Sequence, residues 1–242
     1  MQRIDGRAAD ELRPFSISGD FLLHPLASVL VQCGRTRVVC AVSCEHKVPS
    51  WMKAQQIHGG WITCEYSMLP GSTGERIRRE TAGGKPNGRS LEIQRLIGRS
   101  MRSVADLEAL GERTFYCDCD VMDADGGTRC ASISGAAAAL MLAARSSKTA
   151  GWFPRPPLKE LVAAVSVGII DGEPMLDLCY EEDSRAEVDM NVVMTESGRF
   201  VELQGTAERA PFDRRQLNTL LELAEHGLKQ IFAAQRQLLE VF

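Results

Sequence analysis

Residues 123–129, Asp-Ala-Asp-Gly-Gly-Thr-Arg, combine residue types that suit an anion. They follow a β-rich run and precede an alanine-rich run. Glycines let backbone N–H groups approach an anion, a helix N-terminus carries about half a positive charge, and Arg129 can donate a two-pronged hydrogen bond. The segment predicts a phosphate cradle, although an ordinary strand-to-helix turn with a surface arginine would show the same pattern.

A second glycine–arginine pair stands at residues 87–90, Asn-Gly-Arg-Ser, again just before a run with helical periodicity. Arg89 could share an anion with Arg129 if the two helix starts meet in the fold. Two separate helix starts that each carry a glycine and an arginine strengthen the case for a phosphate site.

Residues 177–191 are rich in carboxylates and contain two candidate ligands, Asp183 and Asp189, for a hard cation such as Mg²⁺ or Mn²⁺. Six extended residues span about 20 Å, too far for both to share one ion, so the chain must bend between them. We place that bend at residues 184–185. The alternative is an acidic hairpin whose carboxylates are simply solvated.

The charges along the chain are strongly segregated although the net charge is only −4. Residues 74–102 hold eight basic and three acidic side chains, whereas residues 171–189 hold eight acidic side chains and one arginine. The net charge argues against indiscriminate binding of nucleic acid. The distribution instead favours phosphates at the first segment and cations at the second.

The predicted elements place these segments at the ends of strands and helices. A hairpin of residues 29–33 and 36–42 and a strand at 61–66 precede a polar loop at 69–88 and a helix that starts at residue 90. The other predicted strands are 115–122, 161–170, 174–178, 187–194 and 200–205, and the other predicted helices are 131–145 and 213–239. Strands followed by a helix occur twice, which predicts an α+β fold built from two related halves.

The bulk composition is that of a cytoplasmic globular protein. The chain has 242 residues and 44% hydrophobic composition, enough for a substantial core, and no apolar run long enough to span a membrane. The eight cysteines stand mostly in strand-like runs and are interpreted as reduced core residues. The four histidines show no ligand spacing.

Five ordered motifs resemble the ribonuclease PH family, and together they cover nearly the whole chain. They are residues 6–14, 88–99, 123–129, 182–194 and 204–208. The resemblance implies a fold related to ribosomal protein S5 domain 2, with two βα halves packed as a single ribonuclease PH domain over residues 1–242. It also implies a homo-hexameric ring, a trimer of dimers.

The resemblance further implies a phosphorolytic 3′→5′ exoribonuclease. Such an enzyme uses inorganic phosphate to trim transfer RNA precursors and other structured RNAs, releases nucleoside 5′-diphosphates and can run in reverse. By analogy with the family, phosphate is bound by Arg89, Gly127, Thr128 and Arg129. The catalytic residues are Asp183 and Asp189, which also hold a divalent metal, Mg²⁺ or Mn²⁺. RNA is contacted by Arg76 and Arg79.

The main alternative is a non-catalytic, RNA-binding ring subunit of the same fold. Such subunits typically lose either the phosphate site or the aspartate pair. Because this sequence keeps both, the enzyme is the favoured hypothesis.

Overall fold

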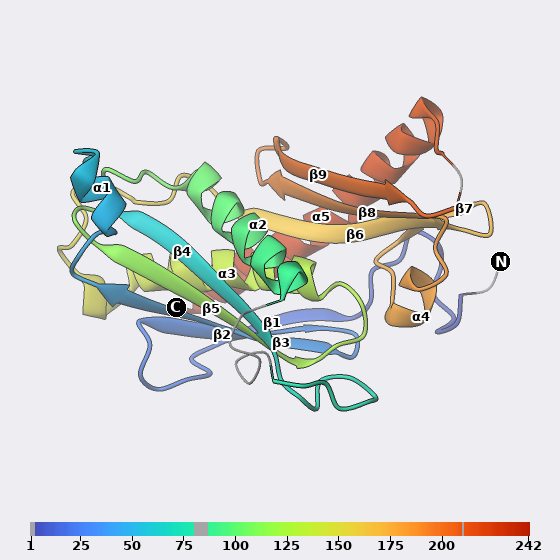
Figure 1. The fold of residues 1–242 in the computed structure, drawn as a ribbon, viewed down its shortest axis with the longest axis horizontal. Coiled ribbons are helices and arrows are strands. Elements are labelled where there is room, and N and C mark those ends of the chain that lie inside the picture. Colours follow the sequence, from blue (N-terminus) through green and yellow to red (C-terminus); the bar gives the residue numbers. More distant parts are fainter. Residues whose placement is uncertain (1–2, 80–86, 210) are drawn as a thin grey trace.

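The computed structural model describes residues 3–79, 87–209 and 211–242, and it has two β-sheets with helices packed against them (Figure 1). The predicted α+β class is therefore confirmed. Within the described part of the chain, no helix is both long enough and apolar enough to cross a membrane.

The first sheet has five strands in the order β1-β2-β3-β5-β4. The strands are β1 (Phe15–Gly19), β2 (Ala27–Cys33), β3 (Thr36–Glu45), β4 (Trp61–Met68) and β5 (Thr114–Asp123). Neighbouring strands are antiparallel except for β4 and β5, which are parallel. Parallel neighbours need a long crossover connection, and α2 (Gly88–Val104) lies in it.

Helix α3 (Thr128–Arg145) joins the two sheets, because its small side chains allow close approach on both sides. Gly135 faces the first sheet so closely that a Cβ there would lie 2.6 Å from the Cys40 sulfur. On the other side, the Ser134 hydroxyl accepts a hydrogen bond from the Ala164 amide of the second sheet at 3.1 Å.

The second sheet has four antiparallel strands in the order β7-β6-β8-β9. They are β6 (Val162–Ile170), β7 (Glu173–Leu176), β8 (Val188–Thr195) and β9 (Phe200–Ala207). The long helix α5 (Arg214–Val241) packs on this sheet, with Gly227 against Leu176. A capping box between Asp213 and Gln216 starts the helix at its predicted position.

Four short elements were not predicted: β1, α1 (Ser50–Ala54), α4 (Tyr180–Asp183) and a 3₁₀ helix at Ser147–Thr149. The predicted start of α2 was two residues late, because Asn87 caps the helix by accepting a hydrogen bond from the Ser90 amide at 2.8 Å. The predicted loop at 69–88 includes residues 80–86, which lie outside the described residues.

Candidate functional site

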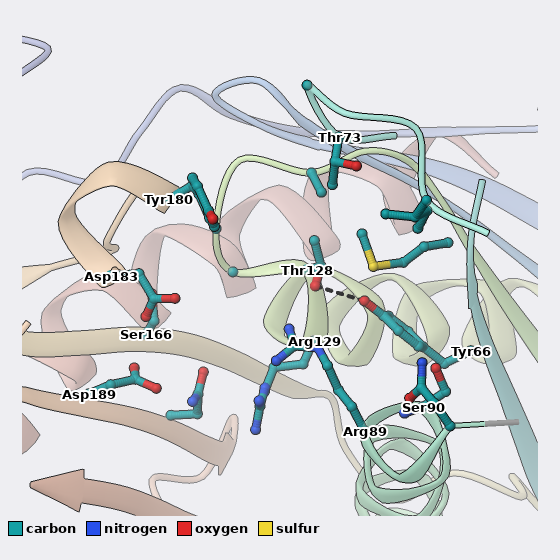
Figure 2. Close-up of a pocket in the computed structure, with 18 of the residues that line it drawn as sticks. Tyr66, Thr73, Arg89, Ser90, Thr128, Arg129, Ser166, Tyr180, Asp183 and Asp189 are labelled. Atoms are coloured by element: carbon teal, nitrogen blue, oxygen red, sulfur yellow. Dashed lines mark hydrogen bonds between the residues drawn. The ribbon is translucent and has the colours of Figure 1, made fainter. Parts of the chain in front are cut away.

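The cradle residues and the two aspartates line one cavity of about 790 Å³, a size typical of a ligand site. Arg89, Gly127, Thr128, Arg129, Asp183 and Asp189 are all part of its wall. Figure 2 shows the side chains of Arg89 and Arg129 reaching toward the aspartates. A smaller hollow of about 610 Å³ is lined by the same two arginines and two aspartates, so these charges lie where the two spaces meet.

The start of α3 has the form expected of an anion cradle. Gly126 and Gly127 have φ angles of 75° and 67°, which favour glycine, and Gly127 caps the helix without a side-chain hydrogen bond. The first N–H groups of a helix have no partner within the helix itself. Thr128 is held in place by Tyr66, a buried residue that sequence reasoning missed, through a 2.8 Å bond between their hydroxyls (Figure 2).

The guanidinium of Arg129 is fixed by neighbours from two other elements. It donates a hydrogen bond to Gln204 of β9 and lies 3.7 Å from Glu92 of α2. Gln204 in turn donates to Glu92 at 3.0 Å. Arg89 is the second residue of α2 and is exposed, so both predicted arginines stand at helix starts that meet at the cavity.

Asp183 ends α4, and Asp189 is the second residue of β8. The turn at residues 184–185 joins these two elements and confirms the predicted bend. Partial burial raises the pKa of both carboxyl groups, and the negative charge of Asp183 raises the pKa of Asp189 further, to about 6. The positive charges of Arg129 and Arg89 lower the pKa of both carboxyl groups, as expected if the arginines and aspartates are close enough to interact electrostatically.

Gly126 brings the cradle and the acidic segment together. A Cβ at this position would lie 2.5 Å from the Leu178 carbonyl oxygen and 2.9 Å from the Tyr180 nitrogen. The Asp125 carboxylate adds a hydrogen bond from the Tyr180 amide at 3.3 Å. The start of α4 can therefore pack against the glycine turn that precedes α3 only because residue 126 has no side chain.

We expect Gly126→Ala to destabilise the protein by about 2–4 kcal/mol, because it combines a left-handed backbone with a clash against backbone atoms. Urea denaturation measures this change. Gly172→Ala is the matched control, since Gly172 has a φ of 80° and no atom within 4 Å of an added Cβ. That control should cost only about 1 kcal/mol. Equal losses in both variants would mean that the close approach at Gly126 is unimportant.

A buried cluster of arginines and carboxylates supports the acidic segment, and sequence reasoning missed it. Arg3 binds Glu182 through two hydrogen bonds of 2.9 and 2.7 Å, and Arg13 binds Asp177 at 2.9 and 2.6 Å. Arg7 lies 3.6 Å from both carboxylates. Burial opposes ionisation of Asp177, but Arg13 holds its pKa below the ordinary value. The arginines belong to an irregular segment, where periodicity gives no signal.

The two predicted RNA-contacting residues, Arg76 and Arg79, are exposed and do not line the cavity. They lie on the segment that follows β4, and its residues Thr73, Gly74 and Ile77 do form part of the cavity wall. The structure thus brings together every predicted site residue except these two, which stand beside the cavity on a segment that borders it.

Fold and cavity define an α+β protein whose cleft carries groups suited to phosphate-bearing ligands. The chain belongs to the 3′ exoribonuclease family of ribonuclease PH type. Residues 11–146 match domain 1 of that family and residues 160–227 match domain 2. The boundary between the two matches falls between α3 and β6, where the first sheet and its helices end.

Solved structures of exosome proteins share the fold. Rice (Oryza sativa) Rrp46 is 20% identical with a TM-score of 0.80, and the alignment covers 98% of this chain and 100% of that one. An archaeal exosome core is 22% identical with a TM-score of 0.77, covering 97% and 91%. The Archaeoglobus fulgidus exosome with RNA bound to the active site is also 22% identical at 0.77, covering 100% and 93%.

Proposed function

We propose that this protein is a phosphorolytic 3′→5′ exoribonuclease, close in role to bacterial ribonuclease PH. Its substrates would be the 3′ ends of transfer RNA precursors and other structured RNAs. The observation that carries the proposal is the convergence of two arginines, a glycine-lined helix start and two aspartates on one cavity. An enzyme of this kind needs to position two anions and neutralise them, and it needs no covalent intermediate.

Inorganic phosphate would be held by the arginines and by the start of α3. Arg89 and Arg129 supply charge-assisted hydrogen bonds, while Gly127 and Thr128 supply backbone and hydroxyl donors. An oxygen of this phosphate attacks the phosphorus of the terminal phosphodiester, and the bond from phosphorus to the O3′ of the preceding nucleotide breaks. The products are a nucleoside 5′-diphosphate and an RNA one residue shorter. Because the bonds exchanged are of similar energy, the enzyme would also add nucleotides in reverse.

The two aspartates fit a hard divalent cation, Mg²⁺ or Mn²⁺. Both are oxygen donors, and the negative charge of Asp183 raises the pKa of Asp189, a repulsion that an adjacent cation would relieve. Glu208 lines the same smaller hollow and its charge acts on both aspartates, but within the described residues no group of three acidic, histidine or cysteine side chains is arranged to hold a metal ion, so the candidate ligands are the two aspartates. That number suits Mg²⁺, which often binds one or two carboxylates together with water and substrate phosphates. A bound ion would stabilise charge that develops on the scissile phosphate.

The same proposal places the chain in the cytoplasm as a single ribonuclease PH domain, assembled into a homo-hexamer, a trimer of dimers. The ring assembly rests on family membership and on the shared fold of the exosome proteins. Arg76 and Arg79 would guide transfer RNA toward the cavity from the segment that borders it.

The decisive experiment incubates a 3′-extended transfer RNA with the protein and Mg²⁺, with and without inorganic phosphate. We expect nucleoside 5′-diphosphates in the presence of phosphate and intact RNA in its absence. Nucleoside monophosphates released without phosphate would indicate a hydrolytic nuclease instead. RNA binding without any release would indicate a non-catalytic ring subunit.

We expect the double change Arg76→Ala with Arg79→Ala to raise the KM for transfer RNA about tenfold, because two cations near the RNA path are lost. The KM for phosphate should stay unchanged, since neither side chain lines the cavity. Steady-state kinetics with each substrate varied in turn measures both values. Arg214→Ala with Arg215→Ala removes two exposed arginines from α5 and controls for net charge. Equal effects on both KM values would contradict this role.

A further inference from the structure

Arg13 lies directly behind the glycine turn of the cradle. Its guanidinium donates hydrogen bonds to the main-chain carbonyl oxygens of Asp125 and, at 3.5 Å, of Gly126. The Gly126 oxygen also accepts a hydrogen bond from the Thr36 hydroxyl at 2.7 Å. A Cβ on Gly127 would lie 3.1 Å from the guanidinium, so Arg13 is in contact with the turn along three successive residues.

The orientation of these two carbonyls determines the direction of the next two N–H groups. In a trans peptide the C=O of one residue and the N–H of the following residue point in opposite directions. Because the oxygens of Asp125 and Gly126 point toward Arg13 and Thr36, the N–H groups of Gly126 and Gly127 point away from them. Neither N–H has an acceptor within the described parts of the chain, and both glycines line the cavity.

Asp177 fixes Arg13 in this position. Its carboxylate accepts hydrogen bonds from the Arg13 amide at 2.9 Å, from Nε at 2.9 Å and from Nη2 at 2.6 Å. Arg13 is 4% exposed, and Asp177 is 3% exposed in a left-handed conformation with a φ of 53°. Aspartate adopts that conformation more readily than most non-glycine residues, so burial and the three hydrogen bonds are what hold the pair in place. The pair is therefore a rigid support.

We propose that Arg13, anchored by Asp177, is a positioning residue that aims the N–H groups of Gly126 and Gly127 at the attacking phosphate. The inference rests on the proposed function. It assigns a positioning role to a residue that contacts neither inorganic phosphate nor RNA. An arginine is required because its planar fork of donors can bind a carboxylate and a carbonyl oxygen at once. A lysine would keep the positive charge beside Asp177 but could not hold both groups in this geometry.

The test compares wild type with Arg13→Lys. We expect the KM for phosphate to rise about tenfold while the KM for RNA stays unchanged and kcat falls less than about threefold. Calorimetric titration of the RNA-free protein with inorganic phosphate should show the same loss of affinity. A second variant, Arg13→Met with Asp177→Asn, removes both buried charges together. It should also raise the KM for phosphate while the KM for RNA stays unchanged, and it provides the test if Arg13→Lys does not fold.

Arg3→Lys is the matched control, because it alters an equally buried arginine–carboxylate pair that reaches Asp177 only at its main-chain oxygen and does not touch the glycine turn. The proposal is overturned if Arg3→Lys raises the phosphate KM as much as Arg13→Lys does, or if Arg13→Lys leaves phosphate binding at the wild-type level. If wild type itself neither binds phosphate nor degrades RNA with it, the proposed function fails and the positioning role fails with it.

Discussion

Asp189→Asn is expected to lower turnover by at least about 1,000-fold while the protein remains folded and assembled. A neutral amide is a poor ligand for a hard cation, and charge on the scissile phosphate would then be left uncompensated. Release of nucleoside 5′-diphosphates from a 3′-extended transfer RNA measures the loss. Unfolding or dissociation of the variant would show that Asp189 has a structural role instead.

The same variant should be more stable than wild type when metal is absent. The folded-state pKa of Asp189 is about 6, against an ordinary value of 3.8. As the pH rises, Asp189 therefore loses its proton in the unfolded chain at a lower pH than in the folded protein. This difference favours the unfolded state, so wild type loses stability as the pH rises from about 4 through about 6. Asparagine does not ionise, so the variant should gain about 2 kcal/mol near neutral pH, allowing for partial solvent exposure, and nothing below about pH 4.

Urea denaturation in a chelating buffer at the two pH values checks this expectation. Asp171→Asn is the matched control, because Asp171 lies in an exposed turn with a φ of 51° that asparagine also tolerates. It should change neither turnover nor stability. A lower stability of Asp189→Asn near neutral pH would show that the ionised carboxylate is favourably paired in the folded protein.

Arg129→Ala should raise the KM for phosphate between about tenfold and 100-fold, with a smaller effect on kcat. The guanidinium is already oriented by Gln204 and Glu92, so its hydrogen bonds to an anion require little further ordering. Charge-assisted hydrogen bonds of this kind contribute about 1.5–3 kcal/mol each. Phosphate titrations at saturating RNA measure the change.

Arg99→Ala controls for the loss of an arginine near the site. Arg99 lies on α2, which Arg129 also contacts, and it forms hydrogen bonds of 3.0 and 2.9 Å with Glu202 of β9. Its side chain does not line the cavity. It should leave the phosphate KM unchanged. A phosphate KM that is insensitive to Arg129→Ala would place the attacking phosphate elsewhere.

Local pattern was enough to predict most of the fold. Strands such as β6 and helices such as α5 follow from apolar periodicity, and their ends lie within two residues of the prediction. Strand β1 was missed because it is a short edge strand with serines on its outer face. Helix α4 has only four residues, and it is stabilised by Glu182, which accepts from the Cys179 amide and from the distant Arg3.

The members of the candidate site could be predicted from glycine, arginine and aspartate spacing, but their convergence could not. It depends on contacts between distant segments, chiefly the missing side chain of Gly126 against residues 178–180. Tyr66 gave no signal because an isolated tyrosine in a strand is an ordinary core residue. The role of Arg13 depends on peptide orientation, which no sequence pattern reports.

The buried ion pair between Arg3 and Glu182 joins residues 179 positions apart in the chain. During synthesis on the ribosome the early arginines emerge long before their carboxylate partners, so the cleft is completed only when most of the polypeptide has been translated. Until residues 182–189 have been made, a nascent chain therefore lacks both this support and the two aspartates of the cavity.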